Sequence, residues 1–195
     1  MDKFYLEKPS IKRKDEIIEY MNEFDLNNSE IHGDGGLDKI LEGYSAEEVI
    51  YEVNKMQDED FAKSLNMCPS KTFLLIREND NKIVGISNIR WNLSKELLEF
   101  AGHIGYGIRP VERRKGYSKI SLYLSLVEAQ KMGLEEVVLG CTTTNIASNK
   151  TILALGGILD HTGIDVSDNI LSNAYVINVN DSIKNYKNQF DKYIK

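Results

Sequence analysis

The spacing of apolar residues changes about one third of the way along the chain. In the first third, apolar residues recur three or four positions apart, which is typical of amphipathic helices. This spacing predicts one helix over 11–24, capped by Ser10, and a second that begins at the capping sequence Ser45–Glu48. The polar, glycine-containing stretch 27–39 is expected to be a loop, and 3–7 a short strand.

From residue 72 onward, short runs of β-branched and aromatic residues replace the helical spacing. The runs 72–77 and 82–91 flank the polar turn 79–81, so they predict a hairpin. A third strand is expected over 103–108, and it should stop at Pro110, which cannot donate to a sheet ladder.

The second half alternates helix and strand. Its predicted elements are a helix over 116–132 that stops at Gly133, a strand over 136–141, a short helix over 147–155, a strand over 174–179 and a terminal helix within 182–195. A right-handed crossover would make the strands 103–108 and 136–141 neighbours or near-neighbours in one sheet. The pattern predicts a mixed α/β domain that spans 1–195.

Composition narrows the class of protein. The chain has 195 residues, 42% of them hydrophobic, which suits one domain with a core of its own. We find no run of about 20 apolar residues and no signal-peptide pattern, so we expect no membrane segment. Cys68 and Cys141 lack CxxC spacing and predict free thiols in the cytoplasm. A net charge of −6 argues against nucleic-acid binding, and no residues have metal-ligand spacing.

One short segment runs against this acidic balance. Its cations are Arg109, Arg113, Arg114 and Lys115, opposed by Glu112 and followed by Gly116. The segment joins a predicted strand to a predicted helix, where unpaired backbone N–H groups and the helix dipole attract anions. It therefore predicts a phosphate-binding loop, although the nucleotide motifs GxxxxGK[ST] and GxGxxG are absent. The alternative is an ordinary solvated basic turn.

Two segments then resemble a known family. Arg113–Ser118, "RRKGYS", resembles the (Gln/Arg)-x-x-Gly-x-(Gly/Ala) signature of the GNAT superfamily of N-acetyltransferases, with Ser118 as a small departure. Leu139–Gly157 resembles the fifth strand and next helix of that family, including its Asn-x-x-(Ala/Ser) step. With "GHIGYGIRP" the set is most similar to a bacterial subgroup of predicted acetyltransferases, and it covers 72–179. The resemblance implies a central, mixed, mostly antiparallel sheet flanked by helices, with the fourth and fifth strands splayed.

The resemblance also implies a function. It is that of an acetyl-CoA-dependent N-acetyltransferase, in which a primary amine of a small molecule or peptide attacks the thioester directly. Because family members often form homodimers, we expect this chain to pair with a second copy of itself. The other expected partner is the amine acceptor, and we expect neither nucleic acid nor membrane as a partner. The residues implied to bind acetyl-CoA are Tyr106, Gly107 and Ile108 for the pantetheine arm, Arg113, Arg114, Lys115, Gly116, Tyr117 and Ser118 for the pyrophosphate, and Asn145 and Ser148 near the reacting end.

The general acid and general base of the family do not both have a clear counterpart in this chain. Many members of the family carry a tyrosine as general acid where this chain has Ile152. The alternative to an enzyme is therefore a degenerate CoA-binding module, and a plain interaction domain is a third hypothesis. His103 is the predicted general base, because its usual pKa lies near working pH, although a purely structural role is its alternative. Glu99 and His32 are further candidates for the base.

Overall fold

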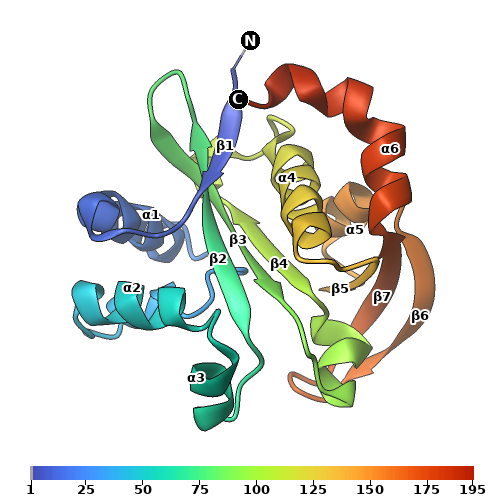
Figure 1. Ribbon diagram of the computed structural model, residues 1–195, viewed down its shortest axis with the longest axis horizontal. Coiled ribbons are helices and arrows are strands. Elements are labelled where there is room, and N and C mark those ends of the chain that lie inside the picture. The colour runs from blue at the N-terminus through green and yellow to red at the C-terminus, as the bar shows by residue number, and fades with distance from the viewer. Residues whose placement is uncertain (1) are drawn as a thin grey trace.

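Two antiparallel sheets form the centre of the molecule (Figure 1). The structure, a computed structural model, describes residues 2–195. The first sheet has the order β1-β2-β3-β4 and the second the order β5-β7-β6, and every strand pairing within them is antiparallel. The strands are β1 (Phe4–Glu7), β2 (Ser70–Arg77), β3 (Lys82–Arg90), β4 (Ile104–Ile108), β5 (Glu136–Thr142), β6 (Ile158–Asp165) and β7 (Ile170–Asn178).

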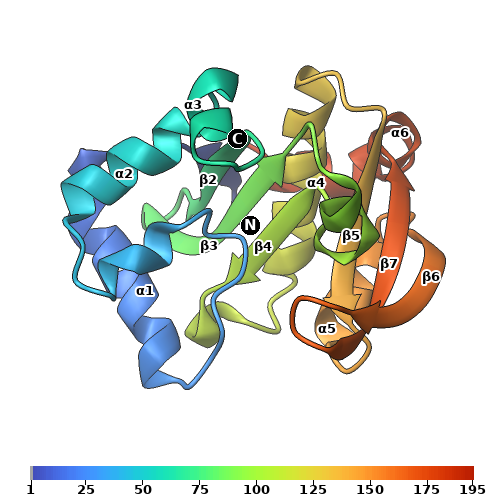
Figure 2. The ribbon, with the colours of Figure 1, turned by 90° about the horizontal axis from the view of Figure 1, so that it is seen from below.

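Helices cover both faces of the first sheet. On one side lie α1 (Lys14–Leu26), α2 (Ala46–Lys55) and α3 (Glu59–Ser64), and on the other lie α4 (Tyr117–Lys131) and α6 (Val179–Phe190) (Figures 1 and 2). The short α5 (Ile146–Leu153) follows β5. No helix in residues 2–195 is both long and apolar enough to span a membrane.

The two covered faces explain the apolar runs in β2 and β3. Phe73 and Leu75 belong to the core beneath α4, whereas Leu74 and Ile76 belong to the core beneath α1 and α2. Successive side chains of a strand point to opposite faces, so a strand buried on both sides is apolar at every position. The predicted mixed α/β fold is confirmed, as are the hairpin and the helix over 116–132, within two residues at each end.

The splayed fourth and fifth strands that the resemblance implied are confirmed, but the expectation that the strands 103–108 and 136–141 share one sheet was wrong. β4 and β5 are the facing edges of two different sheets, and the only bridge recorded between these two edges within residues 2–195 joins Gly102 to Leu139. The π-helical turn Leu97–Ala101 explains the separation, because its backbone lies directly against β5. A Cβ atom at Gly140 would fall 1.5 Å from the Phe100 carbonyl oxygen. The strands therefore meet at one end and run as separate edges beyond it.

Several elements differed from the predictions, among them the strand expected over 174–179, which begins four residues earlier as β7. Ser10 makes no side-chain capping bond, and the chain first forms a 3-10 turn at Ile11–Arg13. The predictions omitted α3 and β6. β6 is an edge strand whose side chains are mostly exposed, including Ile158 and Ile164, so burial does not impose the alternation that would have indicated it.

Candidate functional site

A cavity of about 760 Å³ lies where β4 ends and where α4 and α5 begin. We call it the α4–α5 cavity. Its volume is within the usual range for small-molecule sites. Of the residues predicted to hold acetyl-CoA, all except Lys115 line it: Tyr106, Gly107, Ile108, Arg113, Arg114, Gly116, Tyr117, Ser118, Asn145 and Ser148.

Two helix N-termini converge on this cavity. Gly116 precedes α4 with φ +84°, and Arg114 before it also has a positive φ of +64°. At α5, the side chain of Asn145 accepts a 3.0 Å hydrogen bond from the backbone N–H of Ser148. The Ser118 and Thr151 hydroxyls, 3.0 Å apart, join the two helices. Unpaired N–H groups and the positive ends of two helix dipoles therefore face the same space, which favours an anion.

The side chains that line the cavity add net positive charge. Arg113, Arg114, Lys119 and Lys150 line it, against Glu30 and Glu112. Arg113 is held in place, since it donates to the Ile108 carbonyl at 3.1 Å and to the Ser29 hydroxyl at 2.7 Å. Arg114 has no side-chain hydrogen bond or ion pair within residues 2–195, so its guanidinium is available to a ligand. Lys119, in the first turn of α4, and Lys150, in the last turn of the short α5, were missing from the predicted set.

The cationic segment is only partly directed at this cavity. The buried Arg109 side chain forms ion pairs with Glu19 and Glu23 of α1. The Lys115 ammonium lies 2.8 Å from Glu112, which also pairs with Arg77 at 2.8 Å. Arg109 and the Lys115 side chain therefore stabilise the scaffold around the loop. Of the four cations in the segment, only Arg113 and Arg114 contribute positive charge to the cavity.

Tyr106 connects β4 to α5 across the cavity. Its hydroxyl lies 3.0 Å from the Ser148 hydroxyl. Burial raises the pKa of Tyr106, so the phenol stays protonated at neutral pH. The resemblance implied a contact between Tyr106 and the pantetheine arm but gave the Tyr106 hydroxyl no role, although strand alternation already placed this side chain on the face opposite Gly105 and Gly107. The expected tyrosine position, Ile152, is fully buried in the core.

His103 lies where β4 and β5 meet and lines neither this cavity nor the larger one described below. Its backbone N–H donates to the Val138 carbonyl at 2.7 Å, and its Nδ1 accepts from the Val138 N–H at 3.0 Å. A neutral imidazole that accepts at Nδ1 carries its proton on Nε2, which leaves no free lone pair for an amine proton. The role of His103 as general base stays a prediction, and this hydrogen bond weighs against it.

The contacts of His103 lead to a stability prediction. Burial, with a smaller contribution from the Arg90 guanidinium, lowers the pKa of His103. Below its ordinary pKa of about 6.5, the unfolded chain binds more protons at His103 than the folded protein does, so stability should fall as pH falls. His103→Ala should cost about 1 kcal/mol of unfolding free energy at neutral pH, and His103→Asn should restore most of it by accepting from Val138.

Thermal unfolding at about pH 7.5 and about pH 5.5 tests this prediction. Both variants should lose less stability than the parent protein between the two values, because neither can titrate at position 103. Equal losses in all three proteins would contradict it.

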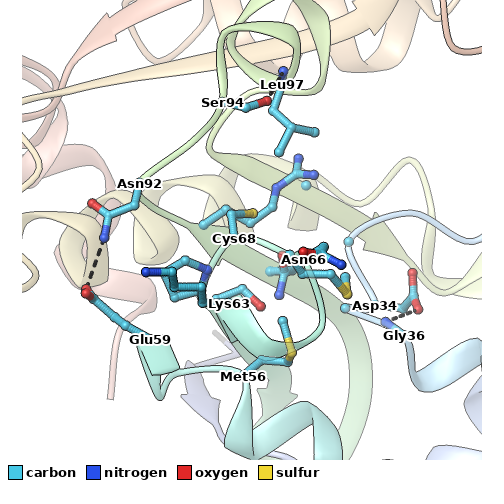
Figure 3. A pocket seen from close by; sticks show the side chains of 18 of the residues that line it. Asp34, Gly36, Met56, Glu59, Lys63, Asn66, Cys68, Asn92, Ser94 and Leu97 are labelled. Atoms are coloured by element: carbon cyan, nitrogen blue, oxygen red, sulfur yellow. Dashed lines mark hydrogen bonds between the residues drawn. The ribbon is translucent and has the colours of Figure 1, made fainter. Parts of the chain in front are cut away.

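A second, larger cavity of about 1020 Å³ lies next to the first (Figure 3). We call it the β3–α3 cavity. Adjacent residues of β4 line the two cavities, Gly105 this one and Tyr106 the other. The loop after α1 passes between them, and a Cβ atom at Gly33 would fall 2.4 Å from the Gly105 carbonyl carbon. Gly33, with φ +74°, therefore allows this loop to lie directly on β4.

The β3–α3 cavity has both acidic and basic walls. Asp34, Asp38, Glu59 and Asp60 line it, with Lys63 and Arg90. Burial and the neighbouring Asp34 raise the pKa of Asp38. Glu99 and His32 lie outside this cavity: Glu99 is exposed on the π-helical turn, and His32 lines the α4–α5 cavity 3.5 Å from Glu30. No cluster of His, Cys, Asp and Glu suited to a metal ion occurs in residues 2–195.

Comparisons with solved structures show the same fold at low sequence identity. The microcin C7 self-immunity acetyltransferase MccE, solved in complex with acetyl-CoA and AMP, matches with a TM-score of 0.61 and 16% identity over 91% of this chain and 93% of that one. RimL, a ribosomal L7/L12 α-N-protein acetyltransferase solved with coenzyme A, matches with a TM-score of 0.62 and 16% identity over 90% and 93%. A GNAT-family acetyltransferase from Streptococcus pneumoniae matches with a TM-score of 0.61 and 19% identity over 90% and 98%.

The sequence itself carries the family assignment. A search of curated proteins found no match. The acetyltransferase (GNAT) family profile, however, matches residues 37–156, which is more than half of the chain and includes β4, α4, β5 and α5. The protein is thus an acetyltransferase, and the chain belongs to the acetyltransferase (GNAT) family.

Proposed function

We propose that acetyl-CoA binds in the α4–α5 cavity, with its pyrophosphate at the N-terminus of α4. The N–H groups of Arg114–Ser118 and the free Arg114 guanidinium would hold this group. The pantetheine arm would lie along the outer edge of β4, over Tyr106–Ile108. That edge carries no partner strand within residues 2–195, so its backbone is available for pairing with the amides of the arm.

The acceptor in this proposal is a primary amine of a small molecule or peptide that enters through the β3–α3 cavity. The position of Gly105 and Tyr106 on the two cavities supports this route. The amine nitrogen would attack the thioester carbonyl carbon, and the carbon–sulfur bond would break. A backbone N–H of β4 would stabilise the developing oxyanion.

Two proton transfers complete the reaction. The hydrogen-bonded hydroxyls of Tyr106 and Ser148 would protonate the departing thiolate, in place of the tyrosine that Ile152 replaces. The acceptor ammonium would lose its proton to the Asp38 carboxylate, because a carboxyl group with a raised pKa is the stronger base.

The observation that carries the proposal is the convergence of two helix N-termini and the unpaired Arg114 on one cavity beside the free edge of β4. The test is release of CoA thiol from acetyl-CoA, with and without a panel of primary amines. An enzyme releases CoA faster when a suitable amine is present. A degenerate CoA-binding module would bind acetyl-CoA and show no amine-dependent release.

We also propose a cytoplasmic homodimer that binds no nucleic acid. The two free cysteines and the net charge of −6 support the location and the absence of nucleic acid. Exposed Ile158 and Ile164 on the edge strand β6 support a contact with a second copy. Light scattering should give twice the mass of one chain, and a monomer at micromolar concentration would contradict the dimer.

A further inference from the structure

Arg90, at the end of β3, is a partly buried cation that has no acidic partner within residues 2–195. Its Nη2 donates to the Ala101 carbonyl at 2.7 Å, and its buried Nε has no hydrogen-bond partner within residues 2–195. Burial lowers the pKa of Arg90, which reflects the uncompensated cost of removing the charge from water. Three other arginines on or beside this sheet, Arg13, Arg77 and Arg109, all form ion pairs with carboxylates.

An unpaired guanidinium of this kind is costly for the folded protein. A buried charge without a counter-ion destabilises a fold by several kcal/mol, and proteins ordinarily pair such groups. Arg90 lines the β3–α3 cavity, so a ligand in that cavity could provide the missing anion. A carboxylate suits this role because its two oxygens match the guanidinium fork.

The register of β3 and β4 places Arg90 within reach of an acceptor molecule whose amine lies near Gly105. Asn88 pairs with Gly105, and the Arg90 N–H donates to the His103 carbonyl at 2.8 Å. Arg90 therefore lies about 7 Å further along β3 than the level of Gly105, on the same face as Asn88. In the proposed function the acceptor amine must reach β4 near Gly105, so a group a few bonds from the amine could reach Arg90.

The acidic wall of the same cavity suits the other end of the acceptor. Asp34 and Glu59 lie at opposite sides of the cavity in Figure 3. Asp34 belongs to the loop that lies on Gly105, where an ammonium group would have to arrive. The cavity thus offers carboxylates near the reacting position and a cation further along β3.

We propose that Arg90 binds a carboxylate of the acceptor, and that the acceptor is an amino acid or short peptide with this carboxylate a few bonds from its amine. The inference rests on the proposed function and adds the substrate class and a specificity-determining residue. A cavity of about 1020 Å³ accommodates molecules of this size.

The test uses acceptor pairs that differ only in the carboxylate. The measured quantity is kcat/KM for CoA release. One comparison sets L-amino acids against their amides, and the other sets an alanyl-aspartate amide against the alanyl-asparagine amide. In the parent protein at least one acid should exceed its amide by about tenfold or more, the usual value of one charge-assisted pair. Arg90→Gln should bring this ratio close to one by raising KM for the acid, with little change for the amide. Lys63→Gln, which removes an exposed cation from the same cavity, should keep the preference.

Each other result overturns the inference. Equal use of acids and amides, a preference that survives Arg90→Gln, or a preference lost in Lys63→Gln would reject Arg90 as the carboxylate site. A protein that binds acetyl-CoA but accepts none of these amines would reject the substrate class and leave the CoA site intact. Absence of acetyl-CoA binding would instead reject the proposed function, and the inference with it.

Discussion

Gly116→Glu should reduce acetyl-CoA affinity by at least about 100-fold, or roughly 2.7 kcal/mol. A Cβ atom at Gly116 meets no other atom within 4 Å, so the new side chain can be accommodated beside the α4–α5 cavity. Its carboxylate would occupy the region proposed for the pyrophosphate and would repel it. The fold should survive, because a carboxylate at a helix N-terminus is itself favourable. Isothermal titration with acetyl-CoA measures the effect.

Two control variants separate repulsion from backbone strain. A non-glycine residue at a φ of +84° costs about 1–2 kcal/mol of stability. Gly133→Glu imposes similar strain at the other end of α4, where φ is +81° and a Cβ also meets no atom, and it should bind acetyl-CoA normally. Gly116→Gln adds the same bulk without charge and should bind more tightly than Gly116→Glu. Normal affinity in Gly116→Glu would mean that the pyrophosphate lies elsewhere.

Tyr106→Phe should lower kcat by about 100-fold, within the range of general acid catalysis, and leave acetyl-CoA affinity nearly unchanged. The variant removes the phenol that lies 3.0 Å from Ser148 and keeps the ring. Steady-state CoA release with a saturating amine gives kcat, and titration gives the affinity.

Tyr117→Phe is the matched control for this prediction. Tyr117 also lines the α4–α5 cavity, but its hydroxyl bonds to Arg77 and Asp2 at 3.3 Å each, away from α5. Its kcat should stay within about threefold of the parent value, since the two hydrogen bonds that it loses, to Arg77 and Asp2, lie in the scaffold and away from the reacting end. An unchanged kcat in Tyr106→Phe would remove Tyr106 from the acid role and leave Ser148 as the hydroxyl to test.

Local patterns were sufficient for much of the fold. The hairpin was predictable because burial on both faces makes residues 73–76 of β2 continuously apolar. The helix after the cationic segment was predictable because Gly116 and Gly133 mark the ends of α4. The edge strand β6 has few buried side chains, so its sequence lacks the alternation that burial would impose.

The position of the phosphate-binding loop could be predicted from the sequence. The side-chain contacts around that loop could not, because their partners come from distant segments of the chain. Arg109 was counted among the phosphate-binding cations, but its partners Glu19 and Glu23 come from a helix distant in sequence. The Tyr106–Ser148 contact and the bond from Val138 to His103 likewise join residues brought together only by folding. The β3–α3 cavity is assembled from the loop after α1, from α3, and from β3 and β4, and no short motif indicates it.

The most direct test of the account is a thermal-shift titration of the parent protein and Gly116→Glu with acetyl-CoA, with ATP as a reference polyphosphate. A ligand at about 100 times its Kd adds roughly 2.7 kcal/mol of stability. We expect the Tm of the parent protein to keep rising with the logarithm of acetyl-CoA concentration and to rise much less with ATP. In Gly116→Glu, acetyl-CoA over the same range should add at most about 0.4 kcal/mol of stability. An equal rise in both proteins, or no rise in the parent, would contradict the placement of acetyl-CoA between α4 and α5.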